Sequence, residues 1–345
     1  MSKKTIIALD AMGGDKAPYI VVDGANLFLK QHKDVYFKIF GDEDLIKSLI
    51  KKDSLLESCC EIIHTKSKIS SDDKPSDALR RGRDSSMRLA INSVQDGLSQ
   101  AVISAGNTGA LMAISKFVFN TLDGIDRPAI TTYVPTRKSP CILLDLGANS
   151  QCSKEQLVQF AIMGDAFAKS ILNLENPRIG LLNIGSESIK GNDLVQATAD
   201  LLSKQNGINY VGFAEGDDIF TGDFDVIVTD GFTGNIALKV LEGTARFIKF
   251  KLSLIFKNSI FGKIGLGFLF LFSSLKIIKI ANEIDPRNYN GAMMIGLKGI
   301  SIKSHGSADK KSFASAILVA YKLINANINH KISTQLSLIK INNED

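Results

Sequence analysis

Five short segments of the chain combine glycine with asparagine, serine or threonine, and most of them follow a short apolar run. They are SAGNTGA (Ser104–Ala110), DLGAN (Asp145–Asn149), NIGSESIKG (Asn183–Gly191), TDGFTGN (Thr229–Asn235) and KSHGSADKKS (Lys303–Ser312). Glycine lets backbone N–H groups approach a ligand closely, and a helix that begins after such a loop favours a bound anion. The same residues also form ordinary turns and helix caps. Five such segments in one chain favour a shared phosphate-rich site.

A sixth segment, IIALDAMGGDKAP (Ile6–Pro18), has the layout of strand, glycine turn and helix start that opens many nucleotide-binding folds. The chain lacks the motifs that would complete that interpretation. It has no G-x-x-x-x-G-K-[ST] loop, no G-x-G-x-x-G after a strand and no G-x-S-x-G elbow. None of the cysteines lies in a loop typical of a nucleophile. A covalent acyl-enzyme is therefore poorly supported.

The elements that must position these loops alternate between short apolar runs and helical patterns. We expect strands at Thr5–Leu9, Tyr36–Phe40, Ala101–Ser104, Ile130–Val134, Cys141–Leu144, Ile179–Asn183, Tyr210–Phe213 and Val226–Val228. We expect helices at Pro18–Lys30, Ser76–Asp96, Ala110–Asn120, Lys154–Asn173 and Asp193–Lys204. This alternation predicts an α/β fold with a mostly parallel sheet between two helix layers, whose ligands bind beyond the carboxyl ends of the strands. Residues 1–345 are expected to form one catalytic domain with two lobes around a cleft.

Composition excludes several classes of protein. The 345 residues carry a formal net charge of +5, and the positive charge is concentrated between Glu242 and Glu283, which enclose seven basic residues and no acid. Nucleic acid is therefore not the expected partner. The four cysteines have no spacing suited to zinc, and we expect no required metal and no cofactor. The first residues run directly into a strand without a signal sequence, which predicts a cytoplasmic protein.

Residues 243–282 form a basic, phenylalanine-rich segment. Its longest uncharged stretch, Ile264–Leu275, has 12 residues, whereas a membrane-spanning helix needs about 20. The pattern favours a helical excursion that lies on a membrane surface, with Phe261, Phe268, Phe270 and Phe272 at the membrane contact. Burial of the same apolar residues in a dimer interface is the alternative, and we expect paired helical stems with a lipid-contacting tip.

Taken together, the segments ALDAMGGDKAP, SAGNTGA, LDLGAN, GLLNIGSESIKG, DVIVTDGFTGNIALK and YNGAMMIGLKGISIKSHGS resemble the bacterial phosphate acyltransferase family PlsX, from about Thr5 to Leu323. The resemblance implies conversion of acyl-[acyl carrier protein] (acyl-ACP) and inorganic phosphate to acyl phosphate and free ACP, for phospholipid synthesis. It also implies a homodimer and a membrane glycerol-3-phosphate acyltransferase that consumes the product. The implied fold has three α/β/α layers and is similar to those of phosphate acetyltransferases and isocitrate/isopropylmalate dehydrogenases.

This chemistry assigns roles to the loop residues. His305 and Asn107 are the predicted catalytic residues, although His305 can also be a capping or packing histidine. The predicted phosphate and oxyanion site comprises Ser104, Gly106, Thr108, Gly109, Thr233, Gly234, Asn235 and Ser307, and the predicted loop-orienting acids are Asp10, Asp15, Asp145, Glu187 and Asp230. Within Lys74–Ala90 the basic residues Arg80, Arg81, Arg83 and Arg88 are expected on one helix, either docking the acidic ACP or forming a solvated face.

Three other functions remain open at this point. A phosphate acyltransferase acting on acyl-CoA would share the chemistry without needing an ACP surface. A metal- and NAD-dependent decarboxylating dehydrogenase would share the fold. A membrane-peripheral scaffold without catalytic activity would use only the basic, phenylalanine-rich segment.

Overall fold

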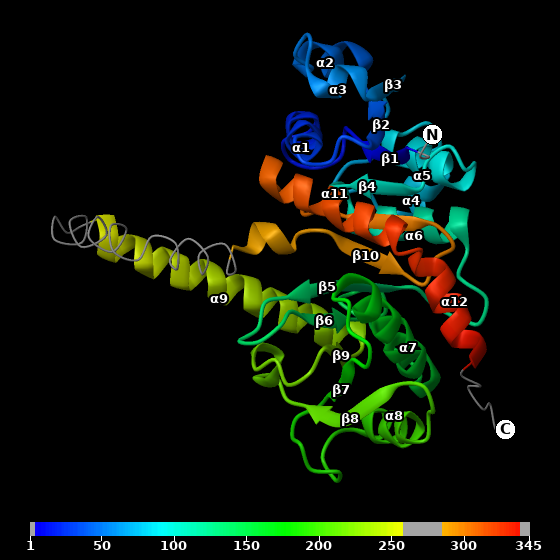
Figure 1. Cartoon of the computed structure of the whole chain (residues 1–345), viewed down its shortest axis with the longest axis vertical. Coiled ribbons are helices and arrows are strands. Elements are labelled where there is room, and N and C mark those ends of the chain that lie inside the picture. The colour runs from blue at the N-terminus through cyan, green and yellow to red at the C-terminus, as the bar shows by residue number, and fades with distance from the viewer. Residues whose placement is uncertain (1–3, 258–284, 339–345) are drawn as a thin grey trace.

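The computed structural model describes residues 4–257 and 285–338, which form one continuous sheet of eleven strands with helices on both faces (Figure 1). Neighbouring strands pair along the sheet in the order β3 (Cys60–His64), β2 (Val35–Gly41), β1 (Thr5–Asp10), β4 (Ala101–Ser104), β11 (Ile300–Lys303), β10 (Ala292–Ile295), β5 (Ala129–Val134), β6 (Cys141–Leu144), β9 (Val226–Val228), β7 (Arg178–Leu182) and β8 (Asn209–Ala214). We call the part containing β1 to β4, β10 and β11 the first lobe, and the part containing β5 to β9 the second lobe.

The prediction of a mostly parallel sheet is confirmed. Only the pairings of β11 with β10, β10 with β5, and β5 with β6 are antiparallel among the described strands. These three reversals have a consequence for the site. The strands β1, β4 and β11 run one way, and β6, β9 and β7 run the other way. The carboxyl ends of the two sets therefore lie at opposite edges of the sheet.

Two helix layers cover the sheet, as predicted. On one face, α1 (Tyr19–Leu29), α7 (Lys154–Ile171), α11 (Lys310–Asn325) and α12 (Ile328–Leu338) enclose the largest apolar core. On the other face, α5 (Ser86–Gln95) and α6 (Thr108–Phe119) cover the first lobe, and α9 (Gly231–Lys257) packs on the second. The remaining helical segments are α2 (Glu43–Leu49), α3 (Leu55–Ser58), α4 (Pro75–Arg81), α8 (Asp193–Ser203) and the short 3₁₀ turns η1 (Asp218–Phe220) and η2 (Pro286–Tyr289).

All eight predicted strands are present within one or two residues of their expected bounds, whereas β3, β10 and β11 were missed. Each missed strand has only four or five residues, and β3 is partly exposed at the sheet edge. The predicted single helix Ser76–Asp96 is wrong, because it divides into α4 and α5. Helix α4 ends at Gly82, and the Ser85 side chain then accepts the N–H of Arg88 and caps α5.

The 27-residue helix α9 starts on the second lobe and extends away from the body of the molecule (Figure 1). Apart from Ile248, its large exposed apolar residues lie three, four or seven positions apart, so they form one stripe along the helix: Phe232, Ile236, Val240, Phe247, Phe250 and Leu254. Within the described ranges, none of the helices combines the length and hydropathy that crossing a bilayer requires. The predicted membrane-contact residues Phe261, Phe268, Phe270 and Phe272 lie outside the described residues.

Candidate active site

Three glycine-rich loops of the first lobe pack tightly against one another after β1, β4 and β11. A Cβ atom on Gly13 would lie 2.5 Å from Asp10 Oδ2 and 2.7 Å from the backbone nitrogen of Gly106. Gly14 adopts a φ of +102°, and a Cβ there would lie 2.9 Å from that of Ala105. The N–H of Asp15 donates to the carbonyl oxygen of Gly306 at 2.9 Å. Only glycine permits this approach, so the Gly13–Gly14 pair holds the three strand ends together.

Asp10 is the buried centre of this loop cluster. Its carboxylate accepts hydrogen bonds from the hydroxyl groups of Ser86 and Ser104, both at 2.6 Å, and Ser104 Oγ in turn accepts the N–H of Gly106 at 3.0 Å. Burial raises the pKa of Asp10, while the bonds from Ser104 and Ser86 oppose that effect. The predicted loop-orienting acid Asp10 therefore fixes the predicted phosphate residue Ser104, whose hydroxyl is bonded within the protein.

Lys303, at the end of β11, places a cation beneath the same loops. Its Nζ donates to the carbonyl oxygens of Ala105, at 3.3 Å, and Ser304. Burial lowers the pKa of Lys303 to about 8, although the charges of Asp10 and Asp15 oppose that effect. Lys303 was not among the predicted site residues, yet its ammonium group bonds to the loop that follows β4, and the charge of Asp10 acts on it.

The depressed pKa of Lys303 gives a stability prediction with a definite sign. In the unfolded chain the lysine keeps its proton up to its usual pKa of 10.5, whereas the folded protein releases it near pH 8. Between these values the unfolded state binds more protons, so rising pH stabilises the native protein, by up to about 1.4 kcal/mol per pH unit. In urea titrations we expect the unfolding free energy of the wild-type protein to rise relative to that of Lys303→Met as the pH increases across this window. A difference that stays constant from pH 8 to 10.5 would contradict the buried lysine.

Asn107 caps α6 and also holds a neighbouring loop. Its Oδ1 accepts the N–H of Ala110 at 3.0 Å. Its Nδ2 donates to the carbonyl oxygens of Ser71 and Asp73, both at 2.9 Å, and more weakly to that of Ser70. In this structure the side chain of this predicted catalytic residue is therefore a positioning group. Thr108 and Gly109 follow it as the first residues of α6, whose N-terminus favours an anion.

His305 lies in the turn after β11, next to Lys303 and exposed at the surface. Its Nδ1 accepts the backbone N–H of Ser307 at 3.2 Å and lies 2.9 Å from the Ser307 hydroxyl. Although His305 is exposed, neighbouring groups partly desolvate its ring and thereby lower the pKa of His305; Glu242 and Asp15 oppose this effect, while Lys303 and Lys239 add to it. Neutral imidazole is therefore favoured near pH 7.

The second lobe contributes a separate cluster around Asp145, which is fully buried at the end of β6. Its Oδ1 accepts the N–H groups of Ile130, Gly147 and Ala148, and its Oδ2 accepts the N–H and the side-chain amide of Asn149. Burial raises the pKa of Asp145, and these bonds oppose that effect. The loop is closely packed, since a Cβ atom on Gly234 would lie 1.9 Å from the carbonyl oxygen of Asp145.

Asp230 starts α9 by capping it. Its carboxylate accepts the N–H groups of Phe232 and Thr233, each at 2.9 Å, and the Thr233 hydroxyl at 2.7 Å. Asn235 is exposed and lines a hollow of about 530 Å³ together with Gly147, Ser150, Gly231, Phe232, Ile236, Lys239 and Val240. Asp230 and Asp145 thus bond to the loops that they are predicted to orient, and of the predicted residues in this cluster Thr233 and Asn235 are exposed to solvent.

Helix α9 links the two clusters, although the strand ends that carry them lie at opposite edges of the sheet. Lys239 is one turn along α9 from Asn235, about 6 Å by helix geometry. Lys239 forms an ion pair with Glu242 at 2.9 Å, and both charges act on His305. The candidate site therefore comprises the first-lobe loops, His305 and the face of α9 that carries Asn235 and Lys239.

The sequence resemblance implies inorganic phosphate as a substrate, and on that basis we expect Lys239→Met to raise the KM for phosphate about tenfold while kcat changes less than threefold. A hydrogen bond to a charged group contributes about 1.5–3 kcal/mol, and the flexible ammonium group is suited to holding an anion before the reaction. Steady-state kinetics with varied phosphate measure the effect. Lys251→Met is the matched control, because Lys251 lies on the same helix but over the ring of Phe247. Equal phosphate KM values for the two variants would contradict the assignment.

Comparison with known proteins decides the family. A family model described as "Fatty acid synthesis protein" matches residues 5–331. The phosphate acyltransferase of Rhodospirillum rubrum is 47% identical over 342 residues, covering 99% of this chain and 97% of the relative. The phosphate acyltransferase of Methylococcus capsulatus is 46% identical over 335 residues, covering 96% and 97%. This chain belongs to the phosphate acyltransferase family. It is therefore an acyltransferase enzyme.

Solved structures of two phosphotransacetylases share the fold. EutD phosphotransacetylase from Staphylococcus aureus superposes with a TM-score of 0.60 at 14% identity, covering 94% of each chain. A phosphotransacetylase from Streptococcus pyogenes gives a TM-score of 0.60 at 13% identity, covering 94% of this chain and 95% of the other. The predicted likeness to phosphate acetyltransferases is thereby confirmed at the level of the fold.

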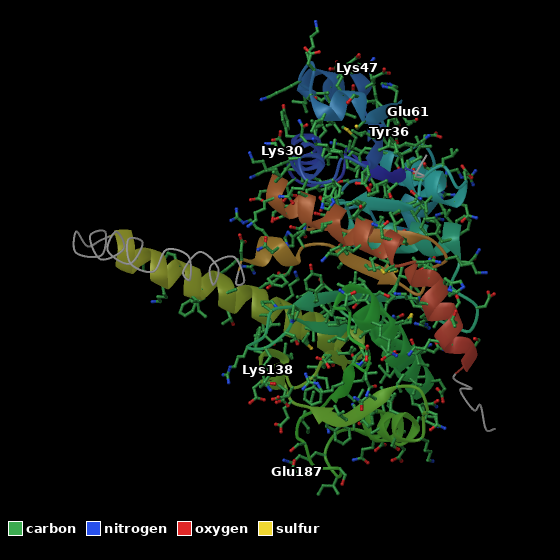
Figure 2. The ribbon with its side chains drawn as sticks, in the orientation of Figure 1. Lys30, Tyr36, Lys47, Glu61, Lys138 and Glu187 are labelled. Atoms are coloured by element: carbon green, nitrogen blue, oxygen red, sulfur yellow. The ribbon has the colours of Figure 1, made fainter. Side chains whose placement is uncertain are left out.

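Not all predicted residues lie at this candidate site. Glu187 is exposed on the loop after β7, where it pairs with Lys190 at 2.8 Å, and Figure 2 shows it at the far end of the second lobe. The predicted arginines do not share one helix: Arg80 and Arg81 lie on α4, Arg83 lies in the connection, and Arg88 lies on α5 over the ring of Phe117. No group of three or more metal-ligating acids, histidines or cysteines is found within residues 4–257 and 285–338.

Sequence reasoning missed four residues that shape the site: Ser86, Lys239, Asn290 and Lys303. The last three lie inside the segments that carry the family resemblance, where a polar side chain close to apolar residues could have indicated a site residue. Ser86 has no such signal, because its bond to Asp10 joins residues 76 positions apart in the chain.

Proposed function

We propose that this phosphate acyltransferase takes its acyl group from acyl-ACP and transfers it to inorganic phosphate, forming acyl phosphate and free ACP for phospholipid synthesis. The observation that carries the proposal is a site rich in cations and N–H groups but poor in activated thiols. Burial raises the pKa values of Cys60 and Cys152 to about 11 and that of Cys141 to about 12, so these thiols are protonated at neutral pH. Phosphate itself then serves as the nucleophile.

The reaction balances without a separate base. An oxygen of HPO₄²⁻ forms a bond to the thioester carbonyl carbon, the C–S bond breaks, and its electron pair goes to sulfur. The proton that phosphate loses is the one that the thiolate gains, either directly or through a bound group. Phosphate has a second pKa of about 6–7, close to that of phosphoserine, so the dianion is abundant at neutral pH. Holding the two reactants together contributes roughly 7–11 kcal/mol, and one donor to the oxyanion contributes about 3–4 kcal/mol.

The test mixes the protein with acyl-ACP and phosphate and traps acyl phosphate with hydroxylamine. We expect hydroxamate formation and phosphate-dependent release of ACP. The same acyl chain on CoA distinguishes the donor, because faster turnover of acyl-CoA would replace this proposal by the CoA-dependent alternative. NADH formation from a hydroxy acid would instead support the dehydrogenase, and absence of any turnover would support a scaffold.

For ACP docking we propose the basic surface formed by Arg80, Arg81 and Arg83. All three side chains are exposed near the loop that Asn107 holds, and only Arg80 has an acidic partner, Asp77, at 3.0 Å. Such a surface attracts an acidic protein in a salt-dependent manner. Paired substitution of Arg80 and Arg81 by glutamate should raise the KM for acyl-ACP and leave that for acyl-CoA unchanged; equal effects on both donors would remove the docking role.

We also propose a homodimer through the apolar stripe of α9, on the cytoplasmic face of the membrane. On the projecting part of this helix the outer residues of the stripe, Phe247 and Leu254, are exposed, and Phe247 is 60% exposed, which is unusual for large apolar residues. A second copy of the same helix would bury this outer part of the stripe, whereas Phe232, Ile236 and Val240 line the hollow beside Asn235 and lie outside the proposed interface. The product, acyl phosphate, would pass to a membrane glycerol-3-phosphate acyltransferase at the same surface.

Substitution of Phe247 and Leu254 by glutamate is expected to convert the dimer to monomer at micromolar concentration, because burying two uncompensated carboxylates from each copy at one interface costs several kcal/mol. Light scattering after gel filtration measures the mass. The control is Phe117→Glu, an exposed phenylalanine that lies on α6. A native protein that is already monomeric, or a variant that remains dimeric, would contradict this interface.

A further inference from the structure

Asn290 lies between η2 and β10, and its side-chain amide makes three hydrogen bonds. Its Nδ2 donates to the Ser304 hydroxyl and to the carbonyl oxygen of Ser312, both at 2.8 Å. Its Oδ1 accepts the backbone N–H of His305 at 2.9 Å. Both donors and the acceptor of the amide are therefore used to hold the turn that carries His305.

The partners of Asn290 belong to different elements. Ser304 follows β11, and its N–H donates to the carbonyl oxygen of Ser104 at 2.9 Å. Ser312 lies in the first turn of α11. Asn290 itself is fixed, because Gly291 after it adopts a φ of +117° and a Cβ there would lie 2.8 Å from the Cα of Ala316. The amide thus ties the His305 turn to both β4 and α11.

The neighbours of His305 favour one tautomer of its neutral ring. A backbone N–H can only donate, so the bond from Ser307 N–H makes Nδ1 of His305 an acceptor. The proton of the neutral ring then sits on Nε2. Protonation of Nδ1 would set two N–H groups against each other. The charges around the ring are Lys303 from β11, Asp15 from the loop after β1, and Lys239 and Glu242 from α9. Partial burial of the ring lowers the pKa of His305, Lys303 and Lys239 add to this effect, and Glu242 and Asp15 oppose it.

We propose that Asn290 is a positioning residue that holds His305 as a neutral Nε2–H donor to the oxygen atoms of the reaction. His305 then donates a hydrogen bond to the oxyanion and keeps its proton throughout. This agrees with a reaction whose proton passes from phosphate to the leaving sulfur. The assignment of His305 to the reacting oxygens rests on the proposed function, whereas its protonation state and its dependence on Asn290 do not.

The first measurement is ¹⁵N NMR of protein labelled at histidine. The chain has four histidines, and His305→Gln identifies the signal of His305. We expect a protonated Nε2 and an unprotonated Nδ1 at pH 7, and a loss of that preference in Asn290→Ala. An imidazolium at pH 7, a proton on Nδ1, or an unchanged signal in Asn290→Ala would overturn the proposal even if the protein turned over no acyl donor.

The second measurement is the pH profile of kcat. For Asn290→Ala we expect kcat to fall about 10- to 100-fold, the phosphate KM to stay within about twofold, and the acid limb to move to higher pH, because the released ring protonates more easily. Asn290→Asp keeps the acceptor for the His305 backbone N–H and serves as the milder variant should the alanine variant fail to fold. Its kcat should lie between those of the wild type and Asn290→Ala. Asn329→Ala controls for stability, because it removes a side-chain amide hydrogen bond to the carbonyl oxygen of Lys298, outside the His305 turn. A wild-type kcat and an unmoved acid limb in both Asn290 variants would refute the role.

Discussion

Asp145→Asn is expected to lower the free energy of unfolding by about 3 kcal/mol. An asparagine at this position has one oxygen, which can serve either the three backbone N–H groups or the two donors of Asn149, but not both. The amide nitrogen then faces at least two donors, and each unsatisfied buried donor costs about 1–3 kcal/mol. Because burial holds the pKa of Asp145 above its usual value, removing the charge recovers part of this cost. The net loss of unfolding free energy is therefore smaller than the summed cost of the unsatisfied donors.

The structural consequence should extend to α9. Asn149 also donates to the carbonyl oxygen of Pro128 at 2.8 Å and accepts the N–H of Gly231 at 2.7 Å. When the Asp145 bonds to Asn149 weaken, the start of α9 loses its support, and Asn235 and Lys239 move with it. Urea unfolding measures the stability, and the KM for phosphate measures the displacement of α9.

Asp123→Asn is the matched control, because this carboxylate is 95% exposed and forms only a surface ion pair with Lys298. We expect a change below about 0.5 kcal/mol there. If Asp145→Asn were no more destabilising than Asp123→Asn, the buried carboxylate would not be organising the second-lobe cluster.

The fold was predictable where the pattern is regular. Buried runs such as Ala101–Ser104 and Val226–Val228 are apolar on both faces, which is typical of central strands between helix layers. The short strands β10 and β11 carry the same signal over four residues each, too few to separate from loop. The break between α4 and α5 depends on Gly82, where a Cβ atom would lie 2.6 Å from the carbonyl oxygen of Ala78. A periodicity that continues through both helices hides this break.

The site was predictable only in its loops. Glycine beside a polar residue shows where backbone N–H groups approach closely, and the Asp10, Ser104 and His305 loops were found in that way. The same reasoning placed the loops together at the carboxyl ends of the strands, because it expected a mostly parallel sheet and could not foresee a reversal between the two lobes. The antiparallel strands β10 and β5 reverse the second lobe, so α9 rather than a strand end brings Asn235 and Lys239 toward His305. No local pattern encodes a reversal that depends on pairing between distant strands.

His305→Ala is expected to lower kcat/KM about 10²- to 10³-fold, the largest effect on activity that we predict for a single side chain. This is the range for removing one donor that stabilises an oxyanion. Folding should be little affected, because the ring is exposed and its hydrogen bonds are confined to Ser307. Initial rates of hydroxamate formation measure the loss, and the thermal midpoint verifies the fold.

Two further variants separate the role of His305 from its rivals. His305→Gln keeps an N–H donor and should recover part of the activity lost in the alanine variant. Ser307→Ala should retain most of the activity, because the backbone N–H that holds Nδ1 remains. The 2.9 Å contact between the Ser307 hydroxyl and Nδ1 also suits a serine activated for nucleophilic attack. If Ser307→Ala were as damaging as His305→Ala, and a burst of covalent acyl-enzyme formed on mixing, then serine rather than phosphate would attack the thioester first.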